Sequence, residues 1–238
     1  MTAAWNNPIR LKAHQNSTES DKTNVVMSQE TEKVTWSGQV ISIQPRIRLI
    51  RSFDERYHNY LGYVLSLKGV CGGQSAEYLV AVGKGAHERH GFRAGMEIGG
   101  IAAPVPDSRL EIAHYYKASK IEILNDAAVP QSNAPPFHGV PPDLGTYRSR
   151  GHRRLDPKTY DAKCLSCIWG CRMPVEMIID QWNPAKKKYR FETFCYGPKS
   201  CQFYRAGATR KVPGRSGMSW EEEDWIDEEA TSHRGPDD

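Results

Sequence analysis

The 238-residue sequence lacks several features that would assign it to a common class of protein. No stretch approaches the roughly 18 consecutive apolar residues that a membrane-spanning helix needs. The first residues contain no apolar core of signal-peptide length, so we expect a cytoplasmic protein with no membrane partner. The motifs of a phosphate-binding P-loop, a G-x-S-x-G nucleophile elbow and an H-E-x-x-H zinc helix are absent. The sequence therefore implies no particular reaction.

The modest net charge of +4 conceals an uneven distribution along the chain. Residues 145–220 contain 16 Lys and Arg against 5 Asp and Glu, whereas residues 221–238 contain one Arg against nine carboxylates. A basic block of this kind favours a polyanionic partner. The acidic tail has three open interpretations: a solubilising segment, an internal mimic of nucleic acid that folds back on the basic block, or a docking peptide for a protein partner.

Changes in composition divide the chain into five segments. The N-terminal residues are polar and without periodicity, short β-like runs follow, and prolines and then cysteines accumulate further on. We expect a disordered polar arm over 1–33, a β-domain over 34–124, a Pro-rich basic linker over 125–160, a Cys-rich metal-binding module over 161–215 and an acidic tail over 216–238.

The β-domain is predicted to contain three strands, a short helix or loop, and two further strands. The strands are expected at Val34–Arg51, Asn59–Leu67, Glu77–Val82, Met96–Val105 and Lys117–Leu124, with the helical insert at Gly83–Phe92. Pro45 predicts a bend or bulge in the first strand, because proline cannot donate to a central ladder. This order resembles an OB-fold, a five-stranded, partly open barrel, although another small β-barrel or a sandwich remains an alternative.

Five of the six cysteines follow one another with the spacing C-x2-C-x3-C-x23-C-x5-C. Two strand-like runs, Val175–Gln181 and Tyr189–Cys195, flank a turn at Asn183-Pro184, so a hairpin would bring the two groups of cysteines together. The stretch is similar to a divergent zinc ribbon. The predicted fold class is therefore mainly β: an OB-like five-stranded barrel and a small metal-stapled β-hairpin module.

The resemblance to a zinc ribbon implies a structural zinc ion, because pairs of thiolates at such spacing converge on one cation. The predicted ligands are Cys164, Cys167, Cys195 and Cys201, with Cys171 as an alternative. Cysteine quartets also hold a 4Fe-4S cluster, which would make the chain an iron–sulfur redox protein. Cys71 is expected to be an ordinary core or turn residue.

Aromatic residues are interleaved with the cations of the basic block, a combination typical of single-stranded nucleic-acid binding. The main hypothesis is a non-catalytic protein that binds single-stranded RNA or DNA, and an adaptor subunit of a larger nucleoprotein assembly is a further alternative. The candidate contacts are Arg153, Arg154, Arg172, Lys186, Lys187, Lys188, Arg190 and Tyr196 in the basic block, and Arg46, Arg48 and Tyr60 in the β-domain.

Overall fold

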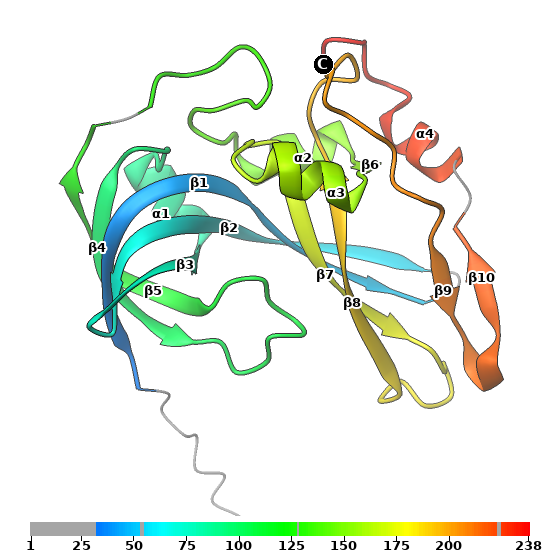
Figure 1. Ribbon diagram of the computed structural model, residues 1–238. Helices are drawn as coiled ribbons and strands as arrows, with labels where there is room; N and C mark the ends of the chain where they lie inside the picture. The colour runs from blue at the N-terminus through cyan, green and yellow to red at the C-terminus, as the bar shows by residue number, and fades with distance from the viewer. Residues whose placement is uncertain (1–31, 53–54, 128, 223–224) are drawn as a thin grey trace, which may run out of the picture. The chain divides into compact units, whose positions relative to one another are not determined.

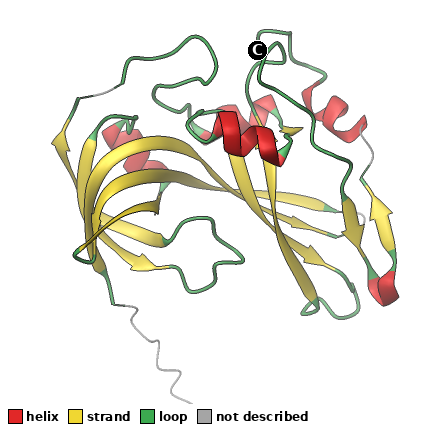
Figure 2. Ribbon diagram, viewed as in Figure 1, coloured by secondary structure: helices red, strands yellow, loops and turns green. Residues whose placement is uncertain are grey.

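A computed structural model describes residues 32–52, 55–127, 129–222 and 225–238, and Figure 1 shows their arrangement. Strands make up most of the regular structure in these ranges (Figure 2). The protein is therefore mainly β over this part of the chain. The predicted disordered arm lies outside the described residues apart from its last two positions.

Five strands form a closed ring. They are β1 (Val34–Arg51), β2 (Arg56–Cys71), β3 (Gln74–Val82), β4 (Glu97–Pro104) and β5 (Tyr115–Asn125). The strand order around the ring is β1-β2-β3-β5-β4 and back to β1, with β3 and β5 parallel and the other neighbours antiparallel. Helix α1 (Lys84–His90) lies between β3 and β4 in the sequence. The predicted number and order of strands and the short helix are confirmed.

The ring encloses the main hydrophobic core. Side chains in a strand alternate between the two faces of the sheet, and in β2 Leu65 and Leu67 are fully buried in this core, whereas Ser66 is half-buried on the opposite face. The register between β1 and β2 shifts twice, and the second shift lies between Arg46 and Ile47, one residue after Pro45. Such bulges bend a strand, so the predicted irregularity near Pro45 is confirmed.

The predicted hairpin is present as β7 (Gly170–Ile178) and β8 (Lys187–Cys195), with Asn183 in the connecting turn. Strand β7 also pairs in parallel with the end of β1, from Leu49 to Arg51. The ring and the hairpin therefore belong to one eight-stranded sheet, in which β6 (Arg153–Arg154) is the last strand. The inward-facing side chains of β7 enter the same core as those of the ring.

The proline-rich segment before the hairpin contains no strand between residues 129 and 143, but it packs on the ring. The Tyr63 hydroxyl donates to the Pro142 carbonyl at 2.7 Å. Helix α2 (Leu144–Arg150) follows and begins at Asp143, whose carboxylate accepts from the Thr146 amide at 3.0 Å. A three-residue α3 (Pro157–Thr159) and a π-helical turn, η1 (Tyr160–Cys164), lead into the cysteine module.

The C-terminal region contains β9 (Lys211–Pro213), the 3-10 turn η2 (Arg215–Gly217), β10 (Ser219–Glu221) and α4 (Trp225–Thr231). The described part of the acidic tail folds back onto the basic block. Asp227 accepts hydrogen bonds from the backbone and the guanidinium of Arg154, at 2.8 and 2.9 Å. None of the described helices is long and apolar enough to span a membrane.

Candidate functional site

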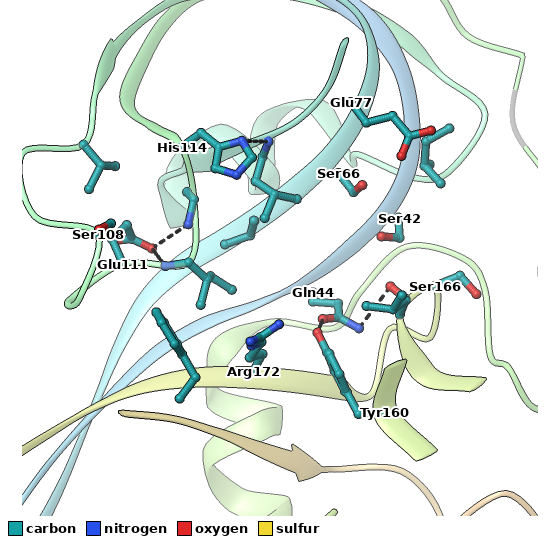
Figure 3. A pocket seen from close by; sticks show the side chains of 18 residues that line it. Ser42, Gln44, Ser66, Glu77, Ser108, Glu111, His114, Tyr160, Ser166 and Arg172 are labelled. Carbon is teal, nitrogen blue, oxygen red and sulfur yellow. Dashed lines mark hydrogen bonds between the residues drawn. The ribbon is translucent and has the colours of Figure 1, made fainter. Parts of the chain in front are cut away.

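A groove of about 590 Å³ lies between the ring and the β7–β8 hairpin, and Figure 3 shows it from close by. Its floor consists of residues from β1, β2 and β3. The loop of residues 105–114, which connects β4 to β5, lines one side, and the hairpin with the cysteine-containing turn before it lines the other. Three regions that are far apart in the sequence therefore meet around one groove.

The floor of the groove follows from strand alternation. Leu65 and Leu67 point into the core, so Val64 and Ser66 between them point to the outer face of the ring, where they line the groove. Ser42 of β1 extends the same surface. Hydroxyl groups next to aliphatic side chains give the floor hydrogen-bonding groups on an apolar background.

Gln44 connects this floor to the cysteine-containing turn. Its Nε2 donates to the carbonyls of Cys164 at 2.8 Å and Cys167 at 3.1 Å. Its Oε1 accepts a hydrogen bond from the Tyr160 hydroxyl at 2.6 Å. All four residues are buried, and burial raises the pKa of Tyr160 above its ordinary value. The Gln44 amide therefore fixes the turn against the ring.

The loop of residues 105–114 is held by two arginines of β1. Arg46 forms an ion pair with the buried Glu111, with 2.7 Å between Nε and Oε2. The Arg48 guanidinium donates to the Leu110 carbonyl at 2.9 and 3.2 Å. Both arginines were predicted as nucleic-acid contacts, and the structure places them under the loop that borders the groove.

The hairpin presents aromatic rings and arginines on one face. Phe191 and Tyr189 are two positions apart in β8 and project from the same side, as strand alternation requires. The Arg172 guanidinium lies 5.3 Å from the centre of the Phe191 ring, and both residues line the groove. Arg109 from the loop lies 4.6 Å from the centre of the Tyr189 ring. Phe191 is 40% exposed.

The predicted lysine cluster lies at the hairpin tip, at the start of β8. Lys186 and Lys188 are exposed. Lys187 is half-buried, and its Nζ lies 2.7 Å from a carboxylate oxygen of Glu176 across the hairpin. The tip therefore offers two exposed ammonium groups, and Lys188 projects from the face of β8 opposite Tyr189 and Phe191.

Four other predicted contacts lie away from the groove. Arg153 is half-buried, with its guanidinium 3.8 Å from the centre of the Tyr204 ring. Arg154 is buried against the acidic tail. Tyr196 is fully buried in the core, and Tyr60 packs against that core from its edge. None of these four side chains is among the groove-lining residues.

A cluster of buried charges lies where the acidic tail meets β1 and β8. Arg51 is 2% exposed and lies between Glu222, at 3.0 Å, and Glu192, at 3.6 Å. Arg56 reaches Glu222 at 2.6 Å, and Arg190 donates to Glu192 at 2.6 Å. Burial alone would raise the pKa of Glu222, but the two arginines beside it outweigh burial and lower the pKa. Arg190, a predicted nucleic-acid contact, therefore belongs to this cluster.

His58 lies beside the charge cluster. Burial, together with the positive charges of Arg56 and Arg51, lowers the pKa of His58 to about 4. Its ring centre is 4.7 Å from that of His152, whose pKa is also lowered by burial and by neighbouring positive charge. Both imidazoles are therefore neutral at physiological pH.

Four cysteines line a second, much smaller cavity of about 10 Å³: Cys164, Cys167, Cys195 and Cys201. Burial raises the pKa of Cys164 to about 12, and the other three thiols contribute further. Cys171 lies elsewhere, fully buried in the main core. As the side chains are oriented, the described residues contain no group of three or more His, Cys, Asp or Glu arranged to hold a metal ion.

Several groove residues carry no recognisable signal in the sequence. Gln44, Tyr160 and the loop of residues 105–114 carry no motif, and only alternation in β2 marks the outer face of the ring. Tyr189 and Phe191 were visible as aromatics within the basic block. Their position opposite the loop depends on the pairing of β7 with β1, which no local pattern predicts.

No protein-family model matches this chain, and neither a curated protein nor a solved structure matches it. Function is therefore inferred from the geometry of the groove and of the cysteine cavity alone.

Proposed function

We propose that this protein binds single-stranded nucleic acid, either RNA or DNA, in the groove between the ring and the hairpin. The observation that carries the proposal is the position of the groove, on the outer face of β2 and β3 and beneath the loop between β4 and β5. We infer that the ring is an OB-fold, because its strand order and the helix after β3 agree with that fold. OB-folds bind oligonucleotides on this face and with this loop.

The hairpin wall supplies groups that suit unpaired bases. Phe191 is partly exposed on the groove side, and Arg172 beside it adds a planar cation. Stacking of a base on an aromatic ring contributes about 1–3 kcal/mol and is available only when the base is unpaired. The serine hydroxyls of the floor can then hydrogen-bond to base edges.

The charges around the groove indicate where the phosphates would lie. Glu77 is exposed on the β3 side and repels phosphate, whereas the charge of Glu111 is compensated by Arg46. On the hairpin side, Arg172 lines the groove and is exposed, and its positive charge attracts phosphate. We therefore expect the phosphates to follow the hairpin side.

The experiment is fluorescence anisotropy of labelled single-stranded oligonucleotides with the full-length protein, in parallel with a duplex of the same sequence. Neutralised phosphates release counterions, so the affinity for single strands should fall with salt, with a logarithmic slope of about −0.7 per phosphate contact. Phe191→Ala should weaken binding by about 5- to 150-fold, which corresponds to a loss of about 1–3 kcal/mol.

Matched variants separate the groove from general surface effects. Tyr57→Ala removes an aromatic side chain that is 64% exposed but does not line the groove, and it should leave binding unchanged. Arg172→Glu, which reverses a charge that lines the groove, should weaken binding, whereas Lys84→Glu on α1 should not. The proposal is refuted if single strands do not bind, if their affinity is indifferent to salt, or if Phe191→Ala and Tyr57→Ala behave alike. Binding of a neutral oligosaccharide in place of nucleic acid would also overturn it.

A further inference from the structure

Four cysteines from two distant segments meet around one cavity. Cys164 and Cys167 form a turn, in which the Cys167 amide donates to the Cys164 carbonyl at 3.1 Å. The hairpin register pairs Gly170 with Cys195, so the end of β8 lies beside this turn. Cys201 follows after a second turn and lines the same cavity. The backbone thus brings the pair Cys164 and Cys167 next to the pair Cys195 and Cys201, whichever rotamers the four side chains adopt.

The cavity is too small and too apolar for an organic ligand. Its volume of about 10 Å³ is close to that of a single water-sized sphere. Apart from the cysteines, most of its lining is apolar or aromatic, including Phe137, Leu155 and Phe203. A water molecule there would find few of the polar partners that buried waters need. A small cation attracted by sulfur fits both the size and the lining.

A backbone amide already points at one of the sulfurs. The Gly197 amide donates to the Cys195 sulfur at 3.4 Å. Such donors stabilise a thiolate more than a thiol, and they are the usual outer partners of metal-binding groups.

The fifth cysteine of the module points away from this cavity. Cys171 is fully buried in the main core, and its thiol donates to the Pro45 carbonyl at 3.4 Å. Cys71 is also in that core, on β2. Strand alternation explains why Cys171 and Cys195 project to opposite sides. Cys195 lies opposite Gly170 in the hairpin, and Cys171 is the next residue of β7, so its side chain projects from the other face of the sheet.

We propose that Cys164, Cys167, Cys195 and Cys201 bind one zinc ion as four thiolates in a tetrahedral, structural site. The thiols turn toward one another when the cation is present and lose their protons to the solvent, since zinc is bound by thiolate. The cavity size favours a single ion over a 4Fe-4S cluster, which contains eight heavy atoms. The site connects the turn before β7 to the segment after β8, and it therefore stabilises the end of the hairpin.

The test begins with the metal content of the full-length protein, purified without chelators and after incubation with zinc chloride. We expect one zinc ion per chain, no visible absorption, and equal loss of zinc in the four serine variants Cys164→Ser, Cys167→Ser, Cys195→Ser and Cys201→Ser. Cys171→Ser and Cys71→Ser are matched controls that should retain the metal.

A second measurement on the wild-type chain guards against variants that fail to fold. Exchange of zinc for cobalt should give the intense visible bands of tetrahedral cobalt and thiolate-to-cobalt charge transfer for four sulfurs. Absence of bound metal, a brown protein with iron and sulfide, or loss of zinc in Cys171→Ser but not in Cys201→Ser would each overturn the assignment. None of these measurements uses nucleic acid, so they can fail or succeed independently of the proposed function.

Discussion

Replacement of Gln44 by leucine tests how firmly the cysteine-containing turn is attached to the ring. Leucine is similar in size to glutamine, so the main change is the loss of the amide. The Tyr160 hydroxyl loses its acceptor at 2.6 Å, and the carbonyls of Cys164 and Cys167 each lose one donor. These groups are buried, and water does not readily replace the lost partners.

The size of the effect depends on which groups are left without any partner. The carbonyls of Cys164 and Cys167 still accept from backbone amides, each at 3.1 Å, so neither is orphaned. The Tyr160 hydroxyl is orphaned, which costs about 1–3 kcal/mol, and each of the other lost hydrogen bonds costs about 1 kcal/mol or less. We therefore expect Gln44→Leu to lower the free energy of unfolding by about 2–4 kcal/mol.

A double-mutant cycle separates the Gln44–Tyr160 contact from the other effects. Tyr160→Phe removes the hydroxyl and should cost about 1–2 kcal/mol, because the Gln44 Oε1 then lacks its donor. In the double variant neither partner is left unpaired by the other, so its cost should be below the sum of the single costs by at least about 0.5 kcal/mol. Urea unfolding, followed by tryptophan fluorescence, gives all four free energies.

Two results would contradict this attachment: Gln44→Leu changes the free energy of unfolding by less than about 0.5 kcal/mol, or the two single effects add within that margin. Either result would mean that the amide does not join the turn to the ring in solution. A change in the urea m-value would indicate a different unfolded state and would be checked before the free energies are compared.

Two further predictions concern the charge cluster. Glu222→Gln should destabilise the protein by about 3 kcal/mol, because it leaves the buried Arg51 short of a counter-charge, whereas Glu221→Gln, which changes an exposed neighbour, should cost under about 1 kcal/mol. Equal effects in thermal or urea unfolding would contradict this difference. His58 has a folded-state pKa of about 4, so the unfolded chain binds the proton first and stability should fall as the pH drops from about 6.5 toward 4. His58→Gln should reduce this pH dependence, and an unchanged profile would refute the assignment.

Much of the ring could be predicted from local sequence. The first strand was predicted at Val34–Arg51, and β1 has these bounds. Gly72 and Gly73, which connect β2 to β3, both have positive φ, +57° and +81°, and glycine adopts this conformation without strain. Strand alternation and turn-forming residues depend on only a few neighbouring positions. They can therefore be recognised in the sequence without knowledge of the fold.

The β7–β8 hairpin was predicted in part from the sequence, and the set of cysteines that meet at its end was left open. Its turn and its second strand were predicted closely, whereas the first strand runs over Gly170–Ile178 instead of the predicted Val175–Gln181. The register that pairs Gly170 with Cys195 brings the two groups of cysteines together. The spacing alone left four or five candidate ligands. Only the structure separates Cys171 from the others, because alternation along β7 places the Cys171 side chain on the face that points into the core.

The basic block shows the limits of counting charges. Its excess of Lys and Arg favoured a polyanionic partner, yet Arg154 is paired with Asp227 and Arg190 with Glu192. Arg46 and Arg48 of the ring support a loop. The acidic tail supplies part of the compensation through Glu222 and Asp227. Net charge is a sum over the chain, whereas the field at a surface depends on which charges are neutralised by neighbours.

The sequence by itself determined the five strands of the ring, their order, and a hairpin that brings two groups of cysteines together, because these depend on local periodicity and on hairpin geometry. The parallel pairing of β1 with β7 was decided only in the tertiary structure, since it joins residues more than a hundred positions apart. That pairing places the hairpin opposite β2, β3 and the loop of residues 105–114, and it thereby creates the groove. The β1–β7 pairing stabilises the protein because side chains of the ring and of the hairpin are buried together in one hydrophobic core. This shared core depends on the whole chain and cannot be recognised in any single segment.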